Sequence, residues 1–209
     1  MFITLEGSEG SGKSSQIPPL VDFLRQEGYT VLPTREPGGT SIGDQVRRIL
    51  GDLRNTEMLP RTEVLLFQAS RAQLVEQVIR PALKRGEVVI SDRFAESTLA
   101  YQGYGHRLDL DLVRSIVEFA TGGLKPDLAL FLDVDVEVGL RRKAEGKEWN
   151  RLDNYDLAFY QRVRGGYLKM IETEPYRWEL IDANGTIEQV QQTIRKVALE
   201  HLSSVKPDG

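Results

Sequence analysis

The stretch that most constrains this chain is the glycine-rich segment Gly7 to Ser14, which reads G-S-E-G-S-G-K-S. It matches the phosphate-loop pattern G-x-x-x-x-G-K-[ST] at every fixed position. Strand-forming residues from Phe2 to Leu5 precede it, and the residues from Gln16 to Glu27 can continue as a helix. Backbone N–H groups in such a strand-to-helix turn point toward an anion, and the helix N-terminus adds positive potential. The segment therefore predicts a strand, a phosphate-binding loop and a helix, in that order.

Two side chains at the end of this segment have expected partners. Lys13 is expected to reach the β- and γ-phosphates of a nucleotide, and the Ser14 hydroxyl is expected to lie on a magnesium ion. The alternative is an ordinary turn rich in glycine and serine. The predicted nucleotide-binding residues are Gly7, Ser8, Glu9, Gly10, Ser11, Gly12, Lys13, Ser14 and Ser15.

Composition excludes several classes of protein. The net charge of −4 and the isoelectric point near 5.4 argue against a general nucleic-acid binder. The chain has no cysteine, which excludes a disulfide framework and cysteine-ligated metal sites. No apolar run approaches the ~20 residues that span a bilayer, so no membrane partner is expected. Because the phosphate loop begins so close to Met1, a removable signal peptide would destroy it, and we expect a cytoplasmic protein.

Five runs of strand-forming residues alternate with helical segments. This alternation predicts one α/β domain, with a five-stranded parallel sheet wrapped by helices on both faces. The domain is expected to span residues 1–202, followed by a loose tail at 203–209. The predicted strands are Phe2–Leu5, Thr30–Leu32, Glu87–Ile90, Leu128–Leu132 and Trp178–Ile181.

Groups suited to anion binding follow three of these strands. The carboxyl ends of parallel strands meet at one edge of a sheet, so Gly7, Arg35 and the pair Asp92-Arg93 are expected to gather there. A carboxylate after a strand is the usual second group on the metal side of a phosphate-loop enzyme, which assigns Asp92 to magnesium with Ser14. The alternative for Asp92 is a helix N-cap. Arg93 would be a poor cap and a good phosphate ligand.

Two further segments have two interpretations each. In the helical stretch Pro60 to Arg85, Arg71 lies one turn from Phe67 inside an apolar stripe. It either snorkels or pairs with a buried carboxylate, or it forms a pocket wall in which an aromatic ring stacks on a base and the guanidinium binds the base edge. The stretch Ala95 to Gly105 offers hydroxyl, amide and phenol groups at close spacing. They suit a base and sugar site, and equally a solvated helix.

A run of cations lies between the fourth and fifth strands. Its members are Arg141, Arg142, Lys143, Lys147 and Arg151, interrupted by Gly146. Such a run is usually a solvated helix face. Here it lacks alternating partners and contains a hinge-like glycine, which favours a lid at about 141–153 that closes over phosphates. Without nucleotides we expect residues 142–150 to be mobile.

Two local patterns concern helices. Pro18 and Pro19 fall inside the first predicted helix, where each removes a backbone hydrogen bond, so a kink or a loosened turn is expected. Thr186 and Gln189 have the spacing of a capping box and predict the start of the last helix.

Several motifs in this order resemble bacterial thymidylate kinase. They are G-S-E-G-S-G-K-S, T-R-E-P-G-G-T, L-L-F-Q-A-S-R-A-Q, S-D-R-F, S-T-L-A-Y-Q-G and the basic lid, and the resemblance runs from Phe2 to about Leu202. It implies transfer of the γ-phosphoryl group of ATP to dTMP with magnesium. It also implies a homodimer, and a cis peptide bond before Pro37. Two alternatives stay open, a kinase for another pyrimidine monophosphate and a nucleotide-dependent switch without an acceptor.

The resemblance also implies roles for individual residues. Phe67 would stack on thymine, Arg71 and Thr98 would bind its edge with Gln102 close by, and Tyr101 would crowd a 2′-hydroxyl. The implied substrate-binding residues are Glu9, Arg35, Phe67, Arg71, Arg93, Ser97, Thr98, Tyr101 and Gln102.

The same resemblance implies catalysis by charge. No general base is needed, because the attacking phosphate is already ionised. The phosphate loop contains no arginine, so the chain resembles the subgroup in which the lid supplies that cation, and Arg151 best matches the family's lid arginine. The implied catalytic residues are Lys13, Arg93, Arg142 and Arg151.

Overall fold

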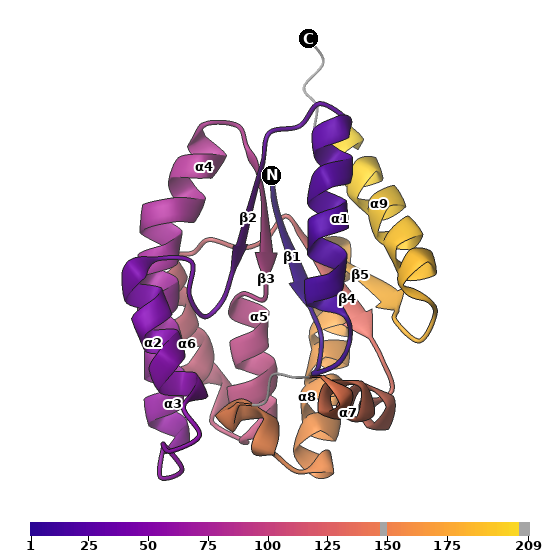
Figure 1. Ribbon diagram of the computed structural model, residues 1–209. Coiled ribbons are helices and arrows are strands. Elements are labelled where there is room, and N and C mark those ends of the chain that lie inside the picture. The colour runs from indigo at the N-terminus through magenta and orange to yellow at the C-terminus, as the bar shows by residue number, and fades with distance from the viewer. Residues whose placement is uncertain (147–149, 205–209) are drawn as a thin grey trace.

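The centre of the molecule is a parallel sheet of five strands in the order β2-β3-β1-β4-β5 (Figure 1). The computed structural model describes residues 1–146 and 150–204. The predicted parallel α/β fold is confirmed. The strands are β1 (Phe2–Glu6), β2 (Val31–Arg35), β3 (Val88–Asp92), β4 (Leu128–Asp133) and β5 (Trp178–Asp182).

Alternation along the strands divides the core between the two faces of the sheet. Ile3 and Leu5 of β1 pack with α1 and α9 on one face, whereas Phe2 packs on the opposite face with the end of α3. Successive side chains of a strand point to opposite faces, so buried strands must be apolar on both. The helices are α1 (Lys13–Gln26), α2 (Ser41–Gly51), α3 (Pro60–Leu74), α4 (Arg80–Lys84), α5 (Ala95–Thr98), α6 (Leu110–Thr121), α7 (Val136–Glu145), α8 (Leu157–Thr173) and α9 (Ile187–Ser204).

Several boundaries differ from the sequence predictions. Every strand extends one to three residues further toward its carboxyl end than predicted, because pairing continues through the charged ends, as between Arg35 and Asp92. Helix α9 includes Ser203 and Ser204, which were predicted to be tail, because Leu202 is buried in the core and holds the last turn. Residues 205–209 lie outside the described part.

The two helical patterns have different outcomes. Helix α1 begins at Lys13 and is continuous through Pro18 and Pro19, so the prolines do not end it. The capping box of α9 is confirmed: the Thr186 backbone N–H donates to Gln189 Oε1 at 2.9 Å, and the Gln189 N–H donates to Thr186 Oγ1 at 3.3 Å.

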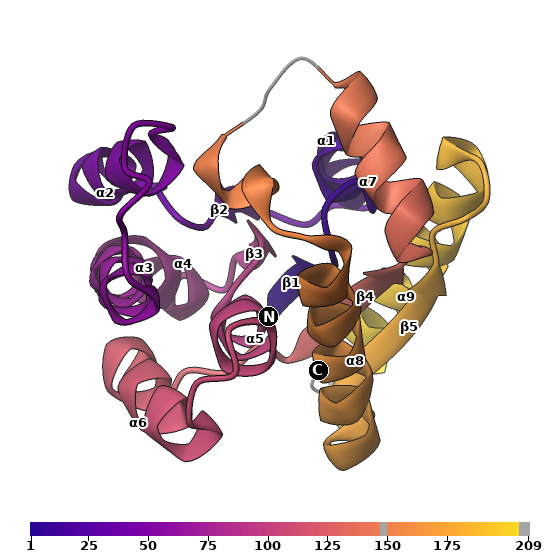
Figure 2. The same cartoon turned by 90° about the horizontal axis from the view of Figure 1, so that it is seen from below.

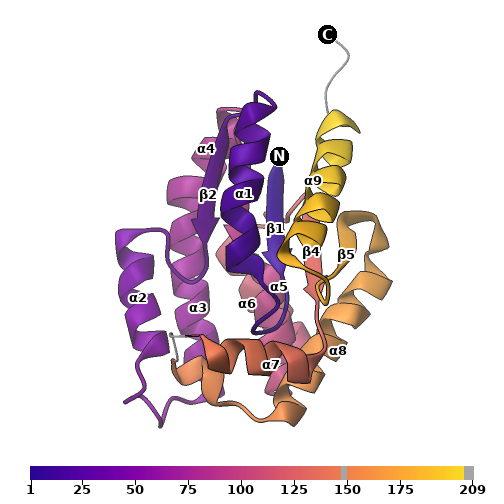
Figure 3. The ribbon, with the colours of Figure 1, turned by 45° about the vertical axis from the view of Figure 1, so that its right-hand side comes forward.

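The loops that follow β1, β2 and β3 all lie at the carboxyl edge of the sheet. Helix α7 crosses below this edge (Figure 3), and the short 3₁₀ turn Arg151–Asn154 lies on the side of α2 in the view from below (Figure 2). Two π-helical segments complete the pattern, Val75–Ile79 between α3 and α4 and Leu99–Gly105 after α5. Among residues 1–146 and 150–204, no helix has the length and apolar character needed to cross a membrane.

Candidate active site

A cavity of about 980 Å³ opens at the carboxyl edge of the sheet. It joins the phosphate loop to residues of α3, β3 and the π-helical segment Leu99–Gly105, so groups distant in sequence share one space. The predicted site residues that line it are Glu9, Gly10, Ser11, Gly12, Lys13, Ser14, Ser15, Phe67, Arg71, Asp92, Arg93, Ser97, Thr98, Tyr101, Gln102 and Arg142. Gly7, Ser8, Arg35 and Arg151 are not among the lining residues.

The phosphate loop has the backbone that its glycines predict. Gly10 has φ +70°, and a Cβ there would lie 1.9 Å from the carbonyl oxygen of Gly139 on α7. Only glycine allows the loop to approach α7 this closely. Lys13, the first residue of α1, is buried, and its Nζ donates to the carbonyls of Gly7 and Ser8 at 3.0 Å each. Burial, reinforced by the positive charge of Arg93, lowers the pKa of Lys13 to about 8.

Ser14 and Asp92 are adjacent, as the magnesium assignment requires. The Ser14 hydroxyl donates to Asp92 Oδ2 at 2.9 Å. Asp92 is not a helix cap, because the N-cap position of α5 is Phe94. A hydroxyl and a carboxylate oxygen fit Mg²⁺, which binds through one or two protein groups together with phosphates and water. The described residues contain no group of three or more His, Cys, Asp or Glu placed to hold a metal, so phosphates would have to complete this site.

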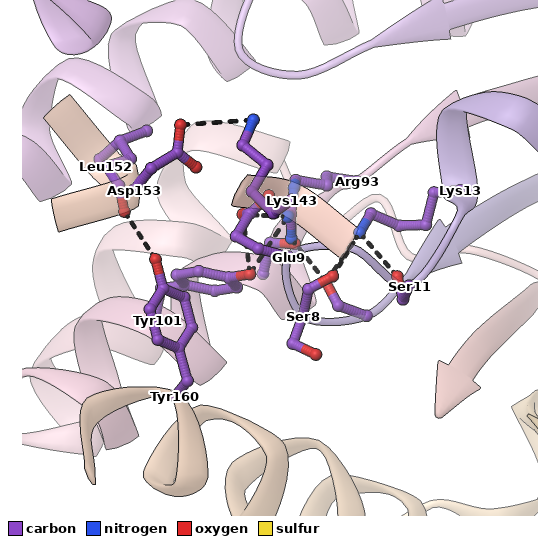
Figure 4. Close-up of polar contacts among 12 residues, drawn as sticks. Ser8, Glu9, Ser11, Lys13, Arg93, Tyr101, Lys143, Leu152, Asp153 and Tyr160 are labelled. Atoms are coloured by element: carbon purple, nitrogen blue, oxygen red, sulfur yellow. Dashed lines mark hydrogen bonds and ion pairs between the residues drawn. The ribbon is translucent and has the colours of Figure 1, made fainter. Parts of the chain in front are cut away.

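Arg93 is held in a strained backbone conformation between the phosphate loop and Tyr101. Its φ of 69° lies in the left-handed region that non-glycine residues rarely adopt. The guanidinium donates to the Gly7 carbonyl at 2.9 Å, to Glu9 Oε1 at 2.6 Å and to the Tyr101 hydroxyl at 3.1 Å (Figure 4). Burial raises the pKa of Glu9, but Arg93 and Lys13 outweigh it and hold the pKa below its usual value. The Glu9 carboxylate is thus paired with Arg93.

A buried glutamate that the sequence reading did not identify supports this turn. Glu6 accepts hydrogen bonds from the backbone N–H of Phe94 at 2.8 Å, from Ser97 Oγ at 2.6 Å and from the Tyr167 hydroxyl at 3.0 Å. Burial, with a contribution from Glu96, raises its pKa to about 7. Glu6 fixes the backbone directly after Arg93. The available signal was a charged residue at the end of an otherwise apolar strand.

Arg71 pairs with a buried carboxylate and also lines the cavity. Its Nε and one terminal nitrogen donate to Glu36 Oε2 at 2.8 and 2.5 Å, and that same nitrogen donates to the Phe94 carbonyl at 2.8 Å. The other terminal nitrogen donates to Gln68 Oε1 and to Thr98 Oγ1, both at 2.8 Å. Arginine has five N–H donors, so every one of them has a protein acceptor. In this arrangement Arg71 holds the pocket wall in place, and binding a base edge would require it to exchange a partner.

The peptide bond between Glu36 and Pro37 is cis, as the resemblance implied. Arg35 just before it is half exposed and pairs with Asp44 at 3.4 Å, away from the cavity lining. Arg47 of α2 lines the cavity instead and donates to the Pro37 carbonyl at 3.0 Å. Sequence reasoning missed Arg47, because it lies inside an ordinary amphipathic helix.

The lid cations divide between two positions. Arg151 is buried and turned away from the phosphate loop: it donates to Glu63 Oε2 at 2.5 Å and to the Leu50 carbonyl at 2.9 Å. Arg142 and Lys143 on α7 line the cavity. The Lys143 ammonium lies 3.3 Å from a carboxylate oxygen of Asp153 (Figure 4), and its positive charge also contributes to lowering the pKa of Glu9. The predicted mobile stretch includes residues 147–149, which lie outside the described residues.

Comparison with known proteins agrees with this geometry. A family model described as thymidylate kinase matches residues 5–194. The chain belongs to the thymidylate kinase family. A curated thymidylate kinase from Roseiflexus castenholzii is 48% identical, with 98% of this chain and 95% of the relative covered. One from Exiguobacterium sp. is 46% identical, with coverages of 97% and 95%.

A solved structure of a family member shares the fold. The crystal structure of thymidylate kinase from Ehrlichia chaffeensis superposes with a TM-score of 0.79 at 32% identity. The superposition covers 95% of this chain and 98% of the other chain. The agreement in fold therefore extends over nearly the whole of both family members.

Proposed function

We propose that this protein phosphorylates dTMP to dTDP with ATP as the phosphoryl donor and magnesium as the metal. The observation that carries the proposal is the single cavity that joins Lys13 of the phosphate loop to the half-buried ring of Phe67. A nucleoside monophosphate whose base stacks on Phe67 has its phosphate directed toward the loop. Donor and acceptor phosphates therefore meet near Arg93.

On the donor side, the loop N–H groups and Lys13 would bind the β- and γ-phosphates of ATP. Lys13 Nζ now donates to loop carbonyls and would exchange them for phosphate oxygens. Ser14 and Asp92 would hold magnesium, which neutralises charge on the phosphate oxygens. These groups are in place before the reaction and lower the barrier by stabilising negative charge on the phosphate oxygens in the transition state. No protein base is required.

On the acceptor side, Arg93 would hold the dTMP phosphate in line with the γ-phosphoryl group. Glu9 orients Arg93, so the loop carboxylate assists acceptor binding without repelling ATP. The Tyr101 ring lies beneath the Arg93 guanidinium at 4.9 Å and is buried. Its bulk would leave no space for a 2′-hydroxyl and would favour a deoxyribose. Ser97 lines the same wall of the cavity.

The remaining positive charge that neutralises the transferring phosphoryl group would come from an arginine of the lid. Arg142 lines the cavity, and its one hydrogen bond among residues 1–146 and 150–204 goes to the Ala183 carbonyl at 2.9 Å, so it is able to turn inward at little cost. Arg151 would first have to leave Glu63. Arg142 is therefore the better placed of the two arginines to neutralise the transferring phosphoryl group, with Arg151 anchoring the lid.

We also propose that the protein is a homodimer in the cytoplasm. Helix α3 packs between α2 and α6, and the three helices form one side of the molecule (Figure 2). Exposed apolar side chains on them include Ile42, Leu65, Leu112 and Phe119, the last 89% exposed. Such a patch favours association with a second copy.

The cytoplasmic location follows from the proposed reaction, which uses ATP to make a precursor for DNA replication.

A kinase assay with a panel of monophosphates tests the function. With ATP and magnesium, dTMP is expected to be converted to dTDP much faster than UMP, CMP or AMP. Preferred conversion of UMP or CMP would instead support a different pyrimidine monophosphate kinase. ATP turnover that needs no monophosphate would support a nucleotide-dependent switch. Light scattering of the purified protein measures its mass in solution, and a monomer would contradict the dimer.

A further inference from the structure

Glu63 is a buried carboxylate with four hydrogen-bond donors and no contact with the cavity. It lies in the first turn of α3 and is 1% exposed. Its Oε1 accepts from Gln102 Nε2 at 2.8 Å and faces His106 Nε2 at 3.3 Å. Its Oε2 accepts from Arg151 at 2.5 Å and from the Tyr155 hydroxyl at 2.9 Å. The proposed reaction assigns no function to this group.

The contact with Glu63 decides which way the Gln102 amide faces. Burial raises the pKa of Glu63, but the hydrogen bonds from His106 and Arg151 outweigh it and lower the pKa to about 2. The carboxylate is therefore ionised at neutral pH and can only accept hydrogen bonds. The Gln102 nitrogen must point toward it. The Gln102 oxygen then has no donor among the described residues, and Gln102 lines the cavity.

The hydroxyl of Thr98 presents a hydrogen-bond donor to the cavity, whereas the Gln102 oxygen presents an acceptor. Thr98 Oγ1 accepts from Arg71 at 2.8 Å and from Gln68 at 3.1 Å, which occupies both lone pairs. Its hydrogen has no protein acceptor within the described ranges, and Thr98 also lines the cavity. Thr98 and Gln102 are four residues apart on one helical stretch. The wall therefore presents a donor from Thr98 beside an acceptor from Gln102.

We propose that Glu63 sets the base specificity of the acceptor pocket by holding the Gln102 amide with its oxygen toward the cavity. The inference rests on the proposed function. Thymine offers an acceptor at O4 beside a donor at N3–H, which complements the pair formed by Thr98 and Gln102. A cytosine ring offers a donor at its amino group beside an acceptor at N3, which opposes both groups. Glu63 is thus a positioning residue that acts through Gln102.

The substitution Glu63→Gln is expected to reverse this polarity. Arg151 and Tyr155 are donors, so they would take the oxygen of the new amide and leave its NH₂ group facing Gln102. Gln102 would then turn its own oxygen toward position 63 and its NH₂ group toward the cavity. The donor at thymine N3 would meet a donor, which leaves both buried groups unpaired.

The test measures binding of dTMP and of 5-methyl-dCMP, which keeps the methyl group and differs at N3 and C4, by calorimetry. For Glu63→Gln we expect the Kd for dTMP to rise at least about tenfold, while the Kd for 5-methyl-dCMP stays unchanged or falls and that for ATP is unchanged. The double variant Glu63→Gln with Gln102→Glu restores an acceptor toward the cavity, and is expected to recover dTMP binding to within about threefold. Tyr155→Phe is the matched control, because it removes a donor to Glu63 and leaves the Gln102 contact.

The outcomes separate this proposal from the proposed function. If both nucleotides weaken equally in Glu63→Gln, or if the double variant does not recover, Glu63 is only a structural residue and the inference is overturned. If Glu63→Gln fails to fold, the double variant provides the same comparison with the wild-type protein, and loss of dTMP preference in the double variant despite intact ATP binding would also overturn it. Failure of the wild-type protein to phosphorylate dTMP would instead contradict the function itself.

Discussion

The phosphate loop and the base pocket are two ends of one cavity, built in opposite ways. In the loop, Lys13 contacts carbonyls five and six residues away. In the base pocket, side chains from separate elements meet: Arg71 bonds Glu36 across 35 residues, and Gln102 bonds Glu63 across 39. The contacts of the loop are therefore mainly local, whereas the base pocket that we propose depends on buried carboxylates that orient the residues lining the cavity.

The difference predicts that a change in the loop removes activity and leaves the fold intact. Lys13→Ala is expected to lower kcat by about 10³-fold or more, because a charge on the transferring phosphoryl group is lost. Its free energy of unfolding should change by less than about 1 kcal/mol, since its partners are loop carbonyls. Steady-state kinetics and urea unfolding measure the two effects. Near-normal turnover would show that the phosphate-loop interpretation is wrong.

In the base pocket, a substitution should chiefly lower the free energy of unfolding. Arg71→Met leaves the Glu36 carboxylate buried without its partner and is expected to lower the free energy of unfolding by about 3–5 kcal/mol. Arg114→Ala, which removes an exposed pair with Asp111, is the control and should change it by less than about 1 kcal/mol. Urea unfolding of both variants measures this. A stable Arg71→Met protein that loses only dTMP binding would assign Arg71 to the base itself.

Variants of the lid arginines test which of them neutralises charge on the phosphoryl group that passes between the two ends of the cavity. We expect Arg142→Ala to slow the chemical step at least about tenfold in single-turnover kinetics, equivalent to ~1.4 kcal/mol. Arg151→Ala should slow it less and lower stability, because it leaves Glu63 with fewer donors. Exposed Arg141→Ala serves as the matched control on the same helix. If Arg151→Ala alone slows the chemical step, Arg151 leaves Glu63 when substrates bind, as the family resemblance implied.

The smallest effect concerns pH at the donor end. The pKa of Lys13 is lowered to about 8 in the free protein, so its charge is lost as pH rises through that value. The kcat/KM for ATP reports the free enzyme and should fall several-fold between about pH 7 and about pH 8.5. Bound phosphates favour the charged form, so kcat should stay level over the same range. Lys13→Arg keeps its charge, and its residual kcat/KM should not show this decrease.

The order and kind of the elements could be read from local patterns. The phosphate loop, the five strands and the capping box of Thr186 depend on residues close together in sequence, and the structure confirms them. Strand ends and the last turn of α9 could not be read in the same way. Pairing with a neighbouring strand extends β2 to Arg35, and burial of Leu202 extends α9.

The sequence by itself determined the parallel α/β fold and the position of the phosphate loop between β1 and α1, and most of the site residues it predicted line the cavity. It left two interpretations of Arg71, and only the tertiary structure showed that its five donors are all taken. The same holds for Glu6 and Glu63, whose partners lie between 39 and 161 residues away, and for the pairing of Arg151 with Glu63. The physical reason is that a polar group's function depends on which donors and acceptors remain unpaired after folding. That inventory is fixed by long-range packing, which local sequence patterns do not record.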